Sequence, residues 1–210
     1  RRTTEDLVQL IELAGEQWLF YKAFPIQVAF LRGTTADPSG NITMEREALT
    51  LDNLAMAMAA RNSKGLVIVQ VERIAAAGSL NPRQVQIPGI LVDCVVVARP
   101  ENHMQTYATA YSPAYSAEVR VPAESVPALP LDLRKIIGRR AAMELAVNSV
   151  VNLGIGMPEA VAAVAAEEKI LDYVTLTTEP GVVGGIPASG MDFGAATNTE
   201  AIISQRSEER

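Results

Sequence analysis

The chain contains 210 residues, of which 49% are hydrophobic, 20% charged and only 5% aromatic. Its 18 Lys and Arg residues against 24 Asp and Glu residues give a net charge of −6, which argues against general nucleic-acid binding. The apolar fraction is too high for a disordered chain, and no apolar run reaches the roughly 18 residues of a membrane-spanning helix.

The amino-terminal half has the pattern of an α/β layer. Residues 7–14 carry apolar side chains at helical spacing, which predicts a helix capped by Thr3 or Thr4 and ended by Gly15. A second, Ala- and Met-rich helix is predicted at 49–61. Strands are predicted at 18–24, 26–31, 66–71 and 93–98, and a turn at 36–41. The last two strands are near-continuous apolar runs, which is typical of strands covered on both faces.

The single cysteine and the single histidine offer little chemistry. Cys94 lies inside the run 92–97, so we expect a small buried hydrophobic side chain and no internal disulfide. His103 follows a proline in a loop and is expected at the surface, and no Ser/His/Asp or Cys/His arrangement can be argued around it. The amino terminus has neither an initiator Met nor a signal-peptide core, so we expect a cytoplasmic protein and a chain excerpted from a longer one.

A proline-rich stretch separates this half from a second α/β unit. Residues 99–130 contain five prolines and little helical period, which predicts an irregular linker and a domain boundary. A helix over 133–145 is expected to bury Leu133, Ile136, Ile137, Ala141 and Leu145. Its basic residues Arg134, Lys135, Arg139 and Arg140 are expected on a solvated face, with Arg140 and Glu144 as an ion pair. A parallel strand–helix–strand unit is predicted at 150–153, 158–166 and 173–177.

Two glycine-bearing loops follow the strands of this second unit, where sites form in parallel sheets. The loop at 152–159 contains Gly154 and Gly156, but Glu159 occupies the third small position of a dinucleotide-binding motif, and a structural turn explains the glycines about as well as a function. In the loop at 177–190, Pro180-Gly181 suits the centre of a type II turn and holds Glu179 at the strand end. A poorly hydrated Glu179 would be a reactive nucleophile, whereas residue composition alone favours an ordinary turn-capping glutamate.

The segments 152–158 (NLGIGMP), 179–181 (EPG) and 184–187 (GGIP) resemble the family I coenzyme A-transferases, and most closely the single-chain acetate/propionate type. Further similar segments are 32–37, 40–43, 67–72, 131–144, 193–195 and 201–203. The resemblance implies two open α/β domains of the CoA-transferase, phosphosugar isomerase-like type, each incomplete. Residues 1–100 would be the second half of the amino-terminal domain, 101–130 a linker region, and 131–210 the first half of the carboxy-terminal domain.

The same resemblance implies a ping-pong transfer of coenzyme A between a short-chain acyl-CoA and a short-chain carboxylate. Glu179 would be the catalytic nucleophile, and the backbone amide of Ile155 would stabilise an oxyanion. Residues expected around the thioester are Gly154, Ile155, Gly156, Gly184 and Gly185. The resemblance further implies coenzyme A as substrate with no other cofactor, no metal, no membrane partner and a homo-oligomer. Because family members are longer, we expect the isolated 210 residues to turn over weakly or not at all.

Alternative functions remain open at this point. Acyl-CoA hydrolysis on the same scaffold would differ in needing no carboxylate acceptor. A non-catalytic sugar-phosphate-binding regulatory domain shares the general layer, but it gives no reason for a glutamate before Pro180-Gly181. A structural segment that only supports partner chains is the third alternative.

Overall fold

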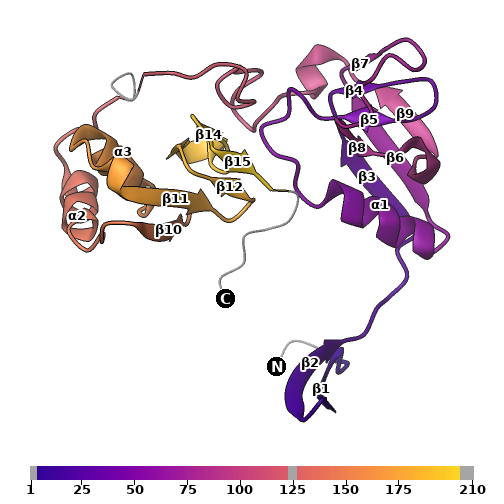
Figure 1. Ribbon diagram of the computed structural model, residues 1–210, viewed down its shortest axis with the longest axis horizontal. Coiled ribbons are helices and arrows are strands. Elements are labelled where there is room, and N and C mark those ends of the chain that lie inside the picture. Colours follow the sequence, from indigo (N-terminus) through magenta and orange to yellow (C-terminus); the bar gives the residue numbers. More distant parts are fainter. Residues whose placement is uncertain (1–3, 123–126, 204–210) are drawn as a thin grey trace.

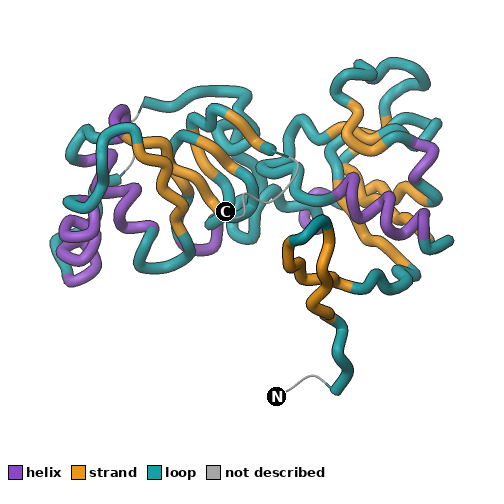
Figure 2. Tube along the Cα trace, turned by 60° about the horizontal axis from the view of Figure 1, so that its bottom comes forward, coloured by secondary structure: helices purple, strands orange, loops and turns teal. Residues whose placement is uncertain are grey.

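The computed structural model describes residues 4–122 and 127–203. The chain forms two bodies, each around its own hydrophobic core, and a hairpin that stands apart from both (Figure 1). One core is built from residues between 26 and 95, and the other from residues between 129 and 176. Both bodies combine helices with β-sheets, which confirms the predicted α/β class, and loops connect these elements (Figure 2). None of the helices in the described ranges has the length and apolar character that a bilayer crossing requires.

The predicted first helix is wrong, because this segment forms a β-hairpin. Strands β1 (Val8–Leu13) and β2 (Glu16–Tyr21) pair antiparallel, with Leu13 opposite Glu16. The two residues between them, Ala14 and Gly15, have φ angles of 53° and 82°. Positive φ at both positions is the backbone of a tight hairpin turn, so Gly15 reverses a strand and does not end a helix. Of the predicted caps, Thr3 lies outside the described residues.

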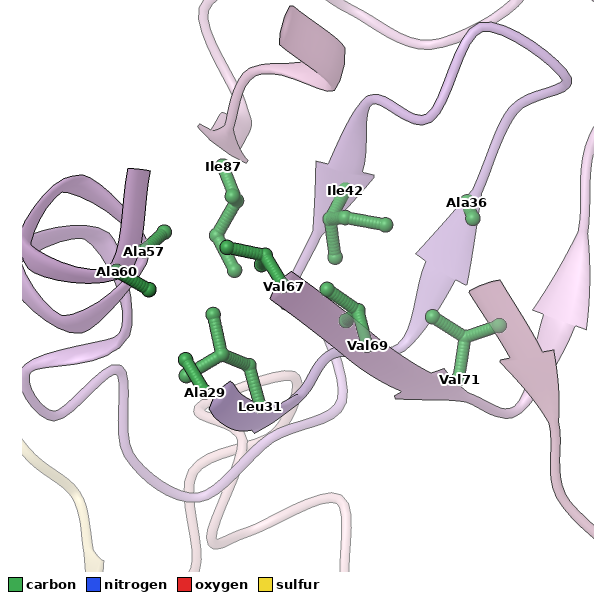
Figure 3. Close-up of a cluster of buried hydrophobic side chains, with 10 residues drawn as sticks. All are labelled: Ala29, Leu31, Ala36, Ile42, Ala57, Ala60, Val67, Val69, Val71 and Ile87. Atoms are coloured by element: carbon green, nitrogen blue, oxygen red, sulfur yellow. The ribbon is translucent and has the colours of Figure 1, made fainter. Parts of the chain in front are cut away.

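The first body is centred on a parallel sheet in the order β3-β6-β9. Its strands are β3 (Val28–Arg32), β6 (Leu66–Val71) and β9 (Cys94–Val97). Helix α1 (Asn53–Asn62) packs Ala57 and Ala60 onto the same core as Val67, Val69 and Val71 (Figure 3). The alternating burial of β6 shows that only this face is fully covered, so the expectation of two covered faces is wrong.

A small four-stranded sheet closes the other side of this core. Its order is β7-β4-β5-β8, with β7 at Arg73–Ile74, β4 at Thr35–Ala36, β5 at Ile42–Thr43 and β8 at Val85–Ile87. Ile42 and Ile87 are fully buried between the two sheets (Figure 3). The predicted turn at 36–41 is confirmed, because the Asp37 carboxylate accepts hydrogen bonds from the backbone amides of Ser39 and Asn41.

The predicted burial of Cys94 and the predicted surface position of His103 are both wrong. Cys94 lies on β9, the edge strand of its sheet, and is exposed. The side chain of His103 is only 5% exposed, because the short helix η2 (Pro100–Asn102) turns it toward Glu47. A further 3₁₀ turn, η1 (Gly89–Leu91), precedes β9.

The second body contains the predicted strand–helix–strand unit. Strand β10 (Ser149–Leu153), helix α3 (Glu159–Glu167), the turn η4 (Leu171–Tyr173) and strand β11 (Val174–Thr178) follow in order, and β10 pairs parallel with β11. Strands β12 (Val182–Val183) and β15 (Ala201–Ile202) extend the sheet antiparallel. A separate pair, β13 (Ile186–Pro187) with β14 (Ala196–Thr197), encloses the turn η5 (Gly190–Asp192).

Asp192 in η5 ties the two bodies together through the irregular segment after β9. Its carboxylate accepts hydrogen bonds from the hydroxyl groups of Thr106, Thr109 and Tyr115. Partial burial favours the neutral acid, but the hydrogen bonds from Thr106 and Thr109 outweigh it and lower the pKa of Asp192. Asp192 therefore stays ionised at neutral pH and holds the irregular segment on the second body.

Helix α2 (Leu133–Ala142) presents a different face from the one predicted. Leu133, Ile136 and Ile137 are 77%, 54% and 52% exposed, whereas the buried positions are Lys135, Gly138 and Ala142. The basic residues form ion pairs with α3 and the segment after it. These pairs are Arg134–Glu159, Lys135–Glu167 and Arg139–Glu168. The predicted Arg140–Glu144 pair is confirmed on the outer surface.

Gly138 decides which face of α2 is buried. A Cβ atom at this position would lie 2.9 Å from the Cβ and 3.0 Å from the carbonyl oxygen of Ala160. The two helices therefore approach each other closely only where one of them has no side chain, and this brings Lys135 and Ala142 into the interface with it.

Replacing Gly138 by valine should lower the free energy of unfolding by about 1–3 kcal/mol, because overpacking displaces α2 from α3. Urea denaturation followed by circular dichroism measures the loss. The exposed Ala141 on the same helix supplies the control, since Ala141→Val changes helix propensity without entering the interface. Equal effects of the two substitutions would contradict this account.

Candidate active site

The register of β10 and β11 brings the two predicted loops together. Leu153 and Thr178 are paired neighbours at the carboxyl ends of these parallel strands. The loop that begins at Gly154 and the turn that begins at Glu179 therefore leave the sheet side by side. This is the edge at which parallel sheets bind ligands.

Glu179 projects from a tight turn between β11 and β12. The amide of Gly181 donates to the carbonyl of Thr178 at 3.1 Å, so Glu179 and Pro180 are the central residues, and the predicted turn centred on Pro180-Gly181 is wrong. Glu179 is exposed, which also contradicts the expected poor hydration. With the residues described here its side chain makes no hydrogen bond or ion pair, so the carboxylate is open to a molecule that approaches from outside.

The loop after β10 combines open space with a fixed backbone. A Cβ atom on Gly154 would meet nothing within 4 Å, and this residue does not have a positive φ. Neither packing nor backbone conformation within the described chain requires glycine there, and the contact of Gly154 with a ligand stays a prediction. Gly156 does require glycine, since its φ angle is 89°.

The amides of this loop differ in what they bind. Gly156 donates its N–H to the Glu159 carboxylate at 2.9 Å and is therefore occupied. The exposed Ile155 has no backbone acceptor for its N–H among the described residues. The amides of Gly154 and Met157 also have no acceptor among the described residues, so all three can bind a new acceptor, and the role of Ile155 stays a prediction from the sequence resemblance.

The structure does not bring Gly184 and Gly185 to this edge. Both follow β12, which runs antiparallel to β11, and the amide of Gly184 donates to the carbonyl of Leu176 at 2.7 Å. Their φ angles are 74° and 75°, and a Cβ atom on Gly185 would lie 2.2 Å from the carbonyl oxygen of Thr197. Backbone geometry is sufficient to explain both glycines, and their contact with a thioester stays a prediction.

Sequence reasoning missed a polar cluster at the carboxyl edge of the first sheet. The Arg32 guanidinium pairs with Glu47 at 2.6 Å, and His103 Nε2 lies 3.5 Å from the same carboxylate. His103 Nδ1 lies 3.0 Å from the Gln70 amide nitrogen. Arg32 and Gln70 are register partners at the ends of β3 and β6, and this shared strand-end position is the signal that could have revealed the cluster.

The cluster borders a cavity of about 180 Å³ between the two bodies. Arg32 and Glu47 line it from the first body, and Met191, Phe193 and Ala195 line it from the second. The described residues hold no group of three or more His, Cys, Asp or Glu side chains placed to bind a metal ion.

The position of His103 makes stability depend on pH. Burial, and then the positive charge of Arg32, lower the pKa of His103 against the opposing attraction of Glu47. Protonation is therefore disfavoured in the folded state, and the unfolded state binds more protons below the unperturbed pKa of about 6.5.

The free energy of unfolding should fall as the pH drops from 7 to 5, and the fall should be smaller in a His103→Gln variant. Urea denaturation at the two pH values, followed by circular dichroism, checks this. An identical pH dependence in both proteins would show that His103 does not carry the effect.

The sequence of this chain is similar to those of known proteins. Residues 3–98 match the family described as Coenzyme A transferase. Caffeate CoA-transferase from Acetobacterium woodii is 52% identical over 202 residues, which are 96% of this chain and 38% of that protein. The chain belongs to the coenzyme A transferase family. The family resemblance expected from the loops around Gly154 and Glu179 is thereby confirmed.

A second relative is similar to this chain in sequence and in three-dimensional structure. Acetate CoA-transferase YdiF from Escherichia coli K12 is 39% identical over 98% of this chain and 39% of its own length. The crystal structure of the YdiF apoenzyme from Escherichia coli O157:H7 matches 97% of this chain and 37% of that chain with a TM-score of 0.84 and 37% identity. A thioester complex of that enzyme with CoA matches with a TM-score of 0.83. This chain spans about 38% of the length of its curated relatives.

Proposed function

We propose that the protein transfers coenzyme A between a short-chain acyl-CoA and a short-chain carboxylate, with Glu179 as the nucleophile. The observation that carries the proposal is the pairing of Leu153 with Thr178, which sets the open Gly154–Gly156 loop beside an exposed carboxylate. Family membership supports the reaction class, and the relatives named as acetate and caffeate CoA-transferases support a carboxylate acceptor.

The proposed chemistry proceeds in balanced steps. A Glu179 carboxylate oxygen attacks the thioester carbonyl carbon, so a C–O bond forms, the C–S bond breaks and CoA leaves as a thiolate. The thiolate attacks the Glu179 carbonyl of the mixed anhydride, which releases the first carboxylate and leaves a glutamyl-CoA thioester. A second carboxylate then reverses the two steps and regenerates Glu179. Because only electron pairs move between carboxyl and thiol groups, coenzyme A is a substrate and the proposal includes no further cofactor.

Each attack places negative charge on a carbonyl oxygen that a fixed donor must stabilise. The free amide of Ile155 supplies one donor beside Glu179. Loss of a single donor of this kind typically costs about 10²–10³ in rate. We propose that the second donor lies outside this chain, that the isolated 210 residues therefore turn over weakly, and that the complete protein acts in the cytoplasm as a homo-oligomer.

Incubation of the complete protein with acetyl-CoA should produce a CoA adduct on the peptide that carries Glu179, detected by peptide mass spectrometry. Glu179→Ala should abolish the adduct and reduce transfer by about 10³–10⁶-fold, the range expected when a covalent nucleophile is lost. Glu200→Ala serves as the control, because Glu200 is another exposed carboxylate that directly precedes a strand of the same sheet. Full transfer activity of Glu179→Ala would refute the proposal.

Acyl-CoA hydrolysis is a second candidate, because the exposed Glu179 is open to water as well as to a carboxylate. The two reactions differ in what resolves the enzyme-bound thioester. For a transferase, release of CoA from acetyl-CoA should be at least about tenfold slower without an added carboxylate than with one, since the glutamyl-CoA thioester waits for its acceptor. Thiol release measured with and without propionate tests this, and caffeate as a third acceptor tests how large the acceptor can be. Release that is independent of any acceptor would favour the hydrolase.

A further inference from the structure

Glu159 is a buried charge directly behind the Gly154–Gly156 loop. It is the first residue of α3 and only 5% exposed, although charged side chains are rarely buried without a partner. Its carboxylate accepts the amide of Gly156 at 2.9 Å, the Arg134 guanidinium at 2.7 Å and the amide of Gly190 at 3.3 Å. Glu159, which occupies the third small position of the dinucleotide-binding motif, therefore holds the loop and Arg134 through hydrogen bonds.

Arg134 and Glu159 together hold Gly156 from both sides, and we call this pair of side chains the clamp. The same Nη2 atom that contacts Glu159 donates to the carbonyl oxygen of Gly156 at 3.0 Å. Glu159 thus fixes the peptide plane before Gly156, and Arg134 fixes the plane after it. Peptide units are planar. The peptide that carries the Ile155 N–H can therefore turn relative to the fixed plane before Gly156 only through the φ and ψ angles of Ile155.

The clamp also leaves the site electrostatically suited to an anion. An unpaired carboxylate beside the loop would repel a developing oxyanion, but the Arg134 charge compensates that of Glu159. Occupation of the Gly156 amide by Glu159 leaves the amides of Gly154, Ile155 and Met157 as the loop donors without an acceptor, and the proposed function uses that of Ile155. The position of a carboxylate at the amino-terminal end of α3 is itself favourable because of the helix dipole.

We propose that Glu159, held by Arg134, is a positioning residue that orients the Ile155 amide toward the reaction centre at Glu179. Neither residue touches the reacting atoms, and both act through the backbone of Gly156. The inference rests on the proposed function, since it assigns the loop to the reaction of Glu179.

The chain offers a matched control for this clamp. Glu167 is the last residue of α3 and pairs with Lys135 of α2 at 2.6 Å, so it bridges the same two helices at the end away from the loop. Glu159→Gln and Glu167→Gln each remove one carboxylate charge from this helix pair. Only the first substitution changes the acceptors around Gly156, because the glutamine NH2 group replaces one of the two acceptor oxygens and faces either the Gly156 amide or both Arg134 and the Gly190 amide with a donor.

In the complete protein, Glu159→Gln should slow formation of the Glu179–CoA adduct and kcat by about 10–100-fold, less than the full loss of an oxyanion donor. KM for acetyl-CoA should change by less than about threefold, because the donor acts mainly in the transition state. Hydrogen exchange followed by mass spectrometry should show faster exchange in peptides covering 154–157. Arg134→Lys should change both readouts in the same direction, since the lysine Nζ atom lies one bond closer to the backbone than the arginine Nη2 atom that makes both contacts.

Wild-type rates and wild-type loop exchange in Glu159→Gln would overturn the inference. Equal losses in Glu167→Gln would also overturn it, because they would trace the effect to general weakening of the α2–α3 contact. If Glu159→Gln does not fold, Arg134→Lys decides by the same two readouts. A wild-type protein that forms no adduct on Glu179 would refute the proposed function itself, whereas faster loop exchange in Glu159→Gln would still report the clamp.

Discussion

Parallel pairing of β10 with β11 in a single register is the constraint on which the candidate site depends. Leu153 opposite Thr178 places the start of one loop next to the start of the other. A slip by one residue would shift Glu179 by about 3.3 Å along the sheet and turn the alternating side chains to the opposite faces. The buried Leu153 and Leu176 oppose such a slip, because their side chains would leave the core. Packing under the sheet thereby determines chemistry at its edge.

Much of this arrangement can be predicted from the sequence because its signals are local. The apolar run at 66–71 and the β-branched and aromatic residues at 173–177 indicate strands, and Pro158 indicates the start of α3. Strand ends in a parallel layer share an edge, so the meeting of the Gly154 loop with Glu179 follows once the strands are located. The family resemblance adds the roles of these residues, which neither composition nor spacing supplies.

The predictions that were wrong depend on what packs against a segment. Ile136 and Ile137 have helical spacing, but the absent side chain of Gly138 decides which side of α2 meets α3. Residues 7–14 fit a helical and a strand period about equally, and the positive φ angles at Ala14 and Gly15 settle the choice. The position of His103 depends on contacts with Glu47 and Gln70, which are distant in the sequence. Such contacts between residues distant in the sequence produce no periodic pattern of residue types from which they could be predicted.

The hairpin of β1 and β2 has a spectroscopic consequence. Trp18, the only tryptophan of the chain, lies on β2 and is 53% exposed. An isolated two-stranded hairpin is marginally stable in water, and this one stands apart from both hydrophobic cores (Figure 1). The intrinsic tryptophan fluorescence of the 210-residue chain therefore reports the environment of one hairpin. The two α/β bodies can lose their packing without a change in that signal, whereas a partner that covers the hairpin would shift it.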